Sequence, residues 1–404
     1  IRVMSIKRNS IVILILTVFF INVNAQNIDT SYKTLESITV VSRNLKITEK
    51  ASPYSITKLD QHQIASSAFR TTPEALMGSN GVFIQKTNHG GGSPFIRGLT
   101  GNQTLILVDG IRLNNSTFRY GPNQYLNTID MFTIDKIEVA KGIGAIEYGS
   151  DAMGGVINLS TKENEYSSRP ILHASTLGKF ISSNMEQTSR SEISFSNAQL
   201  AIQGGLSFKN YGNLKGGGNV DIQNPTGYNE NNIDLKVKLK ITKQDEIIIA
   251  TQNTIQHHIP IYHKIALENY RINEVEKQAR SLNYVKYKHI NNNKWIAEFL
   301  VTASTQRTIE QRSLQRNNST IYRNEADTVH TIGMTSEIIS KPTKYWTFNT
   351  GFDYYQDNIY SSAKELNQQT NTTVFKRGLY PNAAKYNNSS VFNLHHFQLG
   401  RLFI

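Results

Sequence analysis

The chain has 404 residues, contains no cysteine and carries a formal charge of +12 at pH 7. The lack of cysteine excludes disulfides and cysteine-based metal or redox sites. A negative mean hydropathy is typical of soluble proteins, but it also fits a membrane β-barrel, in which only alternate residues of each strand face lipid. Many of the cations alternate with apolar residues, as in DLKVKLKI at 234–241, which indicates a polar sheet face rather than a nucleic-acid site.

The first 25 residues have the pattern of a secretory signal peptide. Lys7 and Arg8 precede an uncharged apolar run, Ile11–Val23, and small residues end at Ala25. This pattern predicts export and cleavage after Ala25. The alternative is a transmembrane anchor, but a run of 13 residues is too short to span the roughly 30 Å of a bilayer core as a helix. We expect Met4 to be a better initiator than the first residue.

Residues 26–41 are expected to form a flexible N-terminal segment that ends in a strand-forming patch. The sequence LESITVV places Ile38 and Val40 in this patch, directly behind the predicted new N-terminus. Such a segment can add its backbone to the edge of a partner's sheet. The patch can equally be the first strand of the domain that follows, and both interpretations stay open.

Residues 42–162 predict a small α+β domain with a mixed sheet. Thr72-Pro73-Glu74 has the composition of a helix start, and Gly78–Gly81 ends that helix. Beyond it, a glycine-rich stretch separates short apolar strands, which requires tight turns or close backbone contacts. The expected elements are strands at Tyr54–Leu59, Val82–Lys86, Leu105–Val108, Ile137–Ala140 and Val156–Leu159, and helices at Gln61–Ser66 and from Thr72.

The order of the motifs IRG, LILVDG, IEVAKG and YGSDAMGGVINL in this domain resembles the plug domain of TonB-dependent outer-membrane receptors. The resemblance extends from about Leu35 to Lys162 and implies a domain that lies inside a barrel and blocks it. The motif glycines are Gly98, Gly110, Gly149, Gly154 and Gly155. The resemblance also implies a TonB box, which we assign to Glu36, Ser37, Ile38, Thr39, Val40 and Val41.

Four charged residues of the plug motifs lie beside apolar strands and therefore need partners: Arg97, Asp109, Glu138 and Lys141. The resemblance implies that such charges pair with barrel carboxylates and lock the plug. Lys141 stands where the family more often has arginine, and lysine cannot make a planar bidentate contact. The alternative is that these charges are solvated at the end of a sheet.

Residues 163–404 predict an incomplete antiparallel transmembrane β-barrel of about ten strands. Alternating strands are joined by short turns on one side and by long loops on the other, as barrels require. The long loops are expected at Tyr211–Asn232, at His257–Gln278 and before Ile332, and an aromatic girdle at Tyr345, Trp346, Tyr354 and Tyr355. Receptors of the family resemble one another in having 22 strands, and unpaired edges cannot face lipid. The pattern therefore predicts the N-terminal portion of a receptor.

The sequence does not predict an enzyme, a resident cofactor or a structural metal. Gly142-Ile143-Gly144 follows a strand, but the third glycine of a dinucleotide-binding turn is replaced by Glu147. Phosphate loops, HExxH helices and nucleophile elbows are absent, so no catalytic residues are assigned.

Candidate ligand-binding residues lie in the predicted outer loops. Histidine and tyrosine can ligate ferric or haem iron, and arginine can bind an anion. The candidates are His89, Arg119 and Tyr120 in the plug-like domain, and His257, His258, Tyr262 and His263 in a barrel loop. The alternative is that these are polar loop residues without a ligand.

The resemblance implies import across the cell outer membrane, in which TonB and its inner-membrane energising complex use the proton gradient to move the plug. An iron chelate is the expected cargo, with haem or a cobalamin-like ligand as the next choices. The competing hypotheses are a truncated, non-transporting receptor fragment and a ligand-binding outer-membrane protein.

Overall fold

The computed structural model describes residues 38–40, 46–48, 55–86, 88–119, 125–142, 148–400 and 402–403. Contacts divide the chain into Ile1–Ser37 and Ile38–Ile404, and all described residues belong to the second part. The predicted signal peptide and most of the segment 26–41 lie outside the described residues. None of the helices in the described part has both the length and the apolar character needed to cross a membrane.

Residues 55–161 form a small α+β domain, as predicted. Its central sheet has the order β3-β8-β9-β6-β7, in which β6 and β9 are parallel and the other neighbours are antiparallel. The strands are β3 (Ser55–Leu59), β4 (Val82–Gln85), β5 (Ser93–Ile96), β6 (Thr104–Val108), β7 (Ile111–Arg112), β8 (Ile134–Lys141) and β9 (Gly155–Thr161). The helices are α2 (Gln61–Ser67), α3 (Thr72–Ala75) and the 3-10 turns η2 (Gly101–Gln103), η3 (Tyr125–Thr128) and η4 (Met131–Thr133).

Local sequence accounts for the helix starts in this domain. Asp60 caps α2 in a capping box, because its Oδ1 accepts from the Gln63 amide at 2.9 Å and its own amide donates to Gln63 Oε1 at 3.0 Å. Helix α3 begins one residue after Thr71, and Pro73 lies in its first turn, where a missing N–H costs no helical hydrogen bond.

The core of the small domain is the apolar centre of β6, β8 and β9. Leu105, Leu107, Ile137, Ile157 and Leu159 are all fully buried. Because β6 is buried along its whole length, its apolar run TLILV fits the two covered faces of a central strand.

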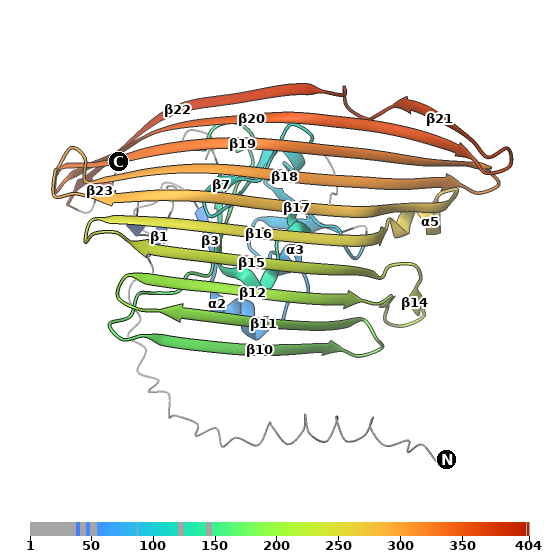
Figure 1. Cartoon of the computed structure of the whole chain (residues 1–404), viewed down its shortest axis with the longest axis horizontal. Coiled ribbons are helices and arrows are strands. Elements are labelled where there is room, and N and C mark those ends of the chain that lie inside the picture. The colour runs from blue at the N-terminus through green and yellow to red at the C-terminus, as the bar shows by residue number, and fades with distance from the viewer. Residues whose placement is uncertain are drawn as a thin grey trace, which may run out of the picture. The chain divides into compact units, whose positions relative to one another are not determined.

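A second, twelve-stranded antiparallel sheet, which we call the wall, follows the small domain (Figure 1). It runs in chain order from β10 to β23, with β21 paired to β20 beside β22. Within the described residues the sheet does not close, since β10 and the β22–β23 pair form its two ends. The strands are β10 (Ile171–Ile181), β11 (Glu186–Ser196), β12 (Leu200–Tyr211), β15 (Tyr228–Lys240), β16 (Asp245–Pro260), β17 (Tyr270–Ile290), β18 (Glu298–Arg316), β19 (Ile321–Thr343), β20 (Trp346–Asn367), β21 (Thr372–Arg377), β22 (Ala384–Leu399) and β23 (Leu402–Phe403).

The wall has a polar inner face and an apolar outer face. On β12, Ser207 and Lys209 are buried against the small domain, whereas Phe208 between them is 58% exposed on the other face. Lys236 and Leu235 on β15 alternate in the same way. This is the inverted pattern of a barrel whose outside faces lipid, and it confirms the predicted antiparallel barrel-type sheet.

Two of the predicted long loops are wrong. His257 pairs with Lys277, so the predicted loop is part of the sheet: β16 continues to Pro260 and β17 already begins at Tyr270. Only a short connection with the helix α5 (Tyr262–Leu267) joins the two strands. Strands β18 and β19 likewise extend until only residues 317–320 connect them. Backbone hydrogen bonds between strands do not require alternating apolar side chains. The strands therefore extend beyond the segments in which apolar and polar residues alternate. The loop before β15 holds a small hairpin, β13 (Leu214–Lys215) and β14 (Ile222–Gln223). β14, α5 and β21 lie at the same end of the wall (Figure 1).

Of the predicted girdle residues, Tyr345 and Trp346 lie at the opposite end of the wall. Trp346 stacks on Phe397 with ring centroids 5.8 Å apart, and Trp295 lies edge-on to Trp346 at 6.2 Å. Tyr355, which was predicted to belong to this girdle, is buried on the inner face, where its hydroxyl accepts from the Arg112 amide at 3.4 Å. The alternation along β20 decides this orientation.

We predict that Gly155→Ala destabilises the small domain by about 1–3 kcal/mol, as overpacking usually does. A Cβ at Gly155 would lie 2.5 Å from the Ala140 carbonyl oxygen and 3.0 Å from Ile96 Cγ2, and the backbone φ is +156°. Amide hydrogen exchange of β6 and β9 measures the effect. Gly217→Ala is the control, because its added Cβ meets no atom within 4 Å. Equal protection in the two variants would contradict the close packing described here.

Candidate functional site

Asp130, at the start of η4, joins the small domain to the wall. Its Oδ2 accepts from Ser207 Oγ at 2.6 Å and lies 3.2 Å from Arg190 Nη1, and its Oδ1 is 2.8 Å from Lys209 Nζ. Burial alone would raise the pKa of Asp130, but Lys209 and Arg190 outweigh it, and the pKa is lowered. The carboxylate is therefore ionised and held by two neighbouring strands, β11 and β12.

Lys209 and Arg190 also pair with carboxylates of the wall, so the charges of both cations are compensated. Lys209 also binds Glu230 at 2.7 Å, and Arg190 binds Glu192 at 2.6 Å and Asp234 at 2.9 Å. Buried charges are tolerated when they are paired and hydrogen-bonded in this way. We call Asp130, Arg190, Ser207, Lys209 and Glu230 the Asp130 cluster.

Wall side chains also hold the backbone of η3, directly before this cluster. Gln256 Nε2 donates to the Asn127 carbonyl at 3.0 Å, and Arg280 Nε donates to the Thr128 carbonyl at 3.1 Å. The segment 127–130 is thus fixed to the wall through both backbone and side chain.

Asp109 makes a second junction. It lies in the tight turn after β6 with φ 53°, and its carboxylate accepts from the Thr161 amide at 2.8 Å and from the Tyr284 hydroxyl at 2.9 Å. Lys236 Nζ lies 3.4 Å from Asp109 Oδ2, and Lys286 Nζ donates to the Asp109 carbonyl at 3.1 Å. We call Asp109, Thr161, Lys236, Tyr284 and Lys286 the Asp109 cluster.

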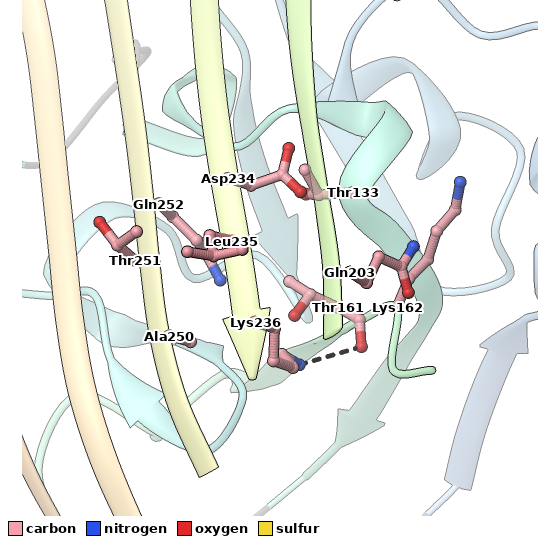
Figure 2. Close-up of a pocket in the computed structure, with 10 residues that line it drawn as sticks. All are labelled: Thr133, Thr161, Lys162, Gln203, Asp234, Leu235, Lys236, Ala250, Thr251 and Gln252. Carbon is pink, nitrogen blue, oxygen red and sulfur yellow. Dashed lines mark hydrogen bonds between the residues drawn. The ribbon is translucent and has the colours of Figure 1, made fainter. Parts of the chain in front are cut away.

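Figure 2 shows the wall side of this junction, where Lys236 points toward Thr161 at the end of β9. Lys236 Nζ donates to the Thr161 carbonyl at 3.3 Å, and Gln252 lies on the adjacent strand. These residues line a cavity of about 10 Å³, which is room for about one water molecule. The junction is therefore closely packed rather than an open ligand site.

The polarity at Asp109 is opposite to the predicted pairing of plug charges with barrel carboxylates, and Asp130 was not among the predicted residues. Asp109 and Asp130 are carboxylates of the small domain that meet lysine and arginine of the wall, because the alternating strands β11, β12 and β15 turn their cations inward. Arg119, which was predicted to meet an anionic ligand, pairs with a carboxylate of the wall, with its Nη2 2.5 Å from Glu310 Oε1.

The other predicted lock residues make contacts within the small domain. Lys141 Nζ donates to Thr57 Oγ1 at 2.9 Å and to the Asn80 carbonyl at 2.7 Å, which corrects its predicted pairing with a barrel carboxylate. Glu138 lies 3.2 Å from Lys136 Nζ. Arg97 has φ 52°, and its guanidinium lies against Gly142.

A cavity of about 490 Å³ lies between the small domain and the wall connections at the α5 end. Leu214 of β13 and Tyr262 of α5 form one side of it. The small domain contributes Arg70, Glu74, Lys86 and His89. This volume is in the range of small-molecule sites, and we take this outer cavity as the candidate ligand site.

One carboxylate in the outer cavity is shared by two cations. Glu74 Oε1 lies 2.8 Å from Arg70 Nη2 and 2.7 Å from Lys86 Nζ. Burial by itself would raise the pKa of Glu74, but Lys86 and Arg70 lower it to about 2. Glu74 is therefore ionised at neutral pH, and the three groups together carry a charge of +1.

His89 reaches the cavity region but not the outside. Its side chain is fully buried, with ring centroids of Tyr211 and Tyr228 at 5.0 and 5.5 Å. Burial, together with Lys86 and Arg70, lowers the pKa of His89 to about 3, so its imidazole is neutral. The expectation that this loop faces outward is wrong, because Gly90 lets the loop pack against the wall. A Cβ there would lie 2.5 Å from Ile259 Cγ2.

The remaining predicted ligand residues are dispersed. His258, with 65% of its side chain exposed, lies 3.6 Å from Glu274, and its ring is 6.4 Å from that of His257. His263 follows Tyr262 in α5, and Tyr120 lies outside the described residues. In the part of the chain that the structure describes, no group of three or more His, Cys, Asp or Glu residues is placed to hold a metal ion.

We predict that Asp130→Ala weakens docking of the small domain by about 3 kcal/mol or more, because Arg190 and Lys209 lose a buried partner. The measurement is amide hydrogen exchange of residues 127–133, which should accelerate. Asp135→Ala is the control, since Asp135 is a half-buried carboxylate on the adjoining strand β8. Unchanged exchange in Asp130→Ala would show that the cluster does not hold the domain.

Acid should loosen the same junctions. The pKa of Asp109 and that of Asp130 are lowered in the folded protein by the wall cations, against the effect of burial. Their stabilisation is fully present above an ordinary carboxyl pKa of about 4 and is lost as the pH falls through the lowered values. Pulsed digestion with pepsin should therefore cut the small domain increasingly as the pH falls below about 4. A digestion rate that follows only the intrinsic activity of pepsin on an unfolded substrate would contradict this.

Comparisons with known proteins agree with this architecture. Residues 48–156 match the family model described as TonB-dependent Receptor Plug Domain. The vitamin B12 transporter BtuB of Vibrio vulnificus is 31% identical over 178 residues, which is 43% of this chain and 27% of that protein. The iron-regulated outer membrane virulence protein of Vibrio cholerae is 34% identical over 142 residues, 33% of this chain and 21% of that protein.

Solved structures share the fold at low sequence identity. The copper transporter OprC superposes with a TM-score of 0.69 at 13% identity, covering 85% of this chain and 52% of that one. The ferric yersiniabactin uptake receptor FyuA of Yersinia pestis gives a TM-score of 0.58 at 14% identity, covering 86% and 63%. The matched parts thus span about a quarter of the curated relatives' length and between 52% and 63% of these solved chains. Residues 48–156 therefore carry a TonB-dependent receptor plug domain, and the chain resembles TonB-dependent outer-membrane receptors in the order of its motifs and in its fold.

Proposed function

We propose that this protein takes part in energy-coupled import of a scarce ligand across the outer membrane, with an iron chelate or haem as the cargo. The observation that carries the proposal is a plug held to the wall by two buried ionic clusters, together with a cavity at the α5 end of the wall. A domain held by hydrogen bonds and ion pairs can be released by force and can dock again. Relatives named as iron-regulated and as a rhizobactin receptor support an iron-type cargo.

The proposed site of force is the TonB box. Glu36, Ser37 and Val41 lie outside the described residues, but Ile38–Val40 form strand β1, which pairs with β2 (Lys46–Thr48). A segment that already pairs as an antiparallel strand has the extended backbone needed for addition to a partner's sheet. We infer that TonB, energised from the inner membrane, takes the place of β2 at this edge.

We predict that Ile38→Pro abolishes uptake but leaves ligand binding unchanged, because proline removes a backbone donor from the added strand. Uptake of a radiolabelled ferric chelate by cells, compared with binding to isolated outer membranes, separates the two effects. Ile38→Val keeps the N–H and serves as the control. Uptake that survives Ile38→Pro would show that the box is assigned to the wrong residues.

The second candidate is a non-transporting receptor fragment that binds ligand at the outer membrane. The outer cavity would serve this candidate equally, since binding a ligand there does not require the plug to move. Expressing the 404-residue chain in cells that lack their own receptors decides between the two. Binding without energy-dependent uptake supports this candidate, whereas uptake that stops when the proton gradient is collapsed supports transport.

A further inference from the structure

The outer cavity contains an unequal set of charges. Of the described residues that line it, the charged ones are Arg70, Glu74 and Lys86, with side-chain exposures of 27%, 11% and 14%. Neutral His89 adds no charge, so one positive charge is left without a carboxylate of its own. The lining also includes apolar side chains, Phe69, Met77 and Leu214. A cavity with these walls fits a ligand that has both an apolar body and an acidic group.

The two cations are held to Glu74 to different degrees. Arg70 makes three hydrogen bonds to it: Nε and the backbone amide each donate to Oε2 at 3.1 Å, and Nη2 donates to Oε1 at 2.8 Å. Lys86 makes one, from Nζ to Oε1 at 2.7 Å. Arg70 is anchored further by its carbonyl, which accepts from the Tyr211 hydroxyl at 2.9 Å. A guanidinium in a bidentate contact is fixed, whereas an ammonium on a flexible stem can turn to another acceptor.

Lys86 is therefore the group that can leave Glu74 at the smallest cost. If it turns toward an acidic ligand group, Glu74 stays paired with Arg70 and no buried carboxylate is left alone. The reverse exchange, in which the Arg70 guanidinium leaves, would break two side-chain hydrogen bonds at once. The geometry thus provides one movable cation and one fixed carboxylate that competes for it.

We propose that Lys86 binds the acidic group of the ligand and that Glu74 acts as an internal competitor that sets how strongly anionic ligands are preferred over neutral ones. This inference rests on the proposed function and specifies its ligand class: chelates that carry carboxylate or phenolate groups. Residue 74 is then a specificity-determining position, because a ligand must compete with the Glu74 carboxylate for the Lys86 ammonium.

The test uses the purified 404-residue chain in detergent micelles, with ferric citrate as the anionic probe and cyanocobalamin as the probe without net charge. Glu74→Gln removes the competitor and should tighten ferric citrate binding in calorimetry by about fivefold, the usual size for a partly exposed charge pair. Lys86→Gln should weaken it by a similar factor. Lys264→Gln is the matched control, since Lys264 on α5 pairs with Glu268 directly after the helix and does not line the cavity. Cyanocobalamin binding should not change in any variant.

A second measurement does not depend on how the variants fold. In the unaltered chain, ferric citrate affinity should fall as sodium chloride is raised, whereas cyanocobalamin binding should not respond. Three results would each overturn the inference. The first is an unchanged ferric citrate affinity in variants that retain the unfolding midpoint of the unaltered chain. The others are a ferric citrate affinity that does not respond to salt, and no ferric citrate binding by the unaltered chain. Failure of the proposed function gives a different result. If only the proposed function is wrong, cells bind ferric citrate in a charge-dependent way but do not take it up. If only this inference is wrong, cells take up the ligand but its binding does not depend on charge.

Discussion

The structure depends on a few carboxylates that are buried where the plug meets the wall. A plug inside a barrel must bury polar surface against a polar inner face, since the apolar face of each strand is turned outward to lipid. Apolar wall residues such as Ile248 and Leu282 do join the core of the plug, but the wall also turns many polar side chains toward the plug, and these need partners. Asp130 and Asp109 solve this by placing one ionised group each among several donors of the wall. Buried pairs of this kind contribute little net stability compared with apolar packing, but breaking one partner is costly, so they fix position and orientation.

Much of the fold could be predicted from the sequence, because its periodicities are local. The apolar runs at Leu105–Val108 and Val156–Leu159 became β6 and β9, and alternation at 234–241 correctly placed Lys236 inward. The predicted ends of the strands were wrong for a physical reason. Toward the α5 end the residues of β16 and β17 are mostly polar and no longer alternate regularly, yet the ladder hydrogen bonds continue.

The candidate site could be predicted only in part, because its pairs join distant segments. Asp109 was found since it lies in a recognisable motif, but Asp130 was missed, although an acid amid the apolar residues of NTIDMFTI is a detectable signal. Its partner Lys209 is far along the chain, and one sequence cannot show which inward lysine meets which carboxylate. His89 was misplaced because three successive glycines indicate an exposed loop as readily as a loop pressed against tyrosines.

The strands that hold the plug are among the first that follow it in the chain. Asp130 is 60 residues from Arg190 and 77 from Ser207, which makes these contacts short in sequence compared with those of β20 to the plug, at 241 to 243 residues. Contacts with a small sequence separation form with a lower loss of chain entropy. The plug can therefore associate with β11 and β12 before the later strands are in place, and it then serves as a template on which the growing sheet is assembled in order.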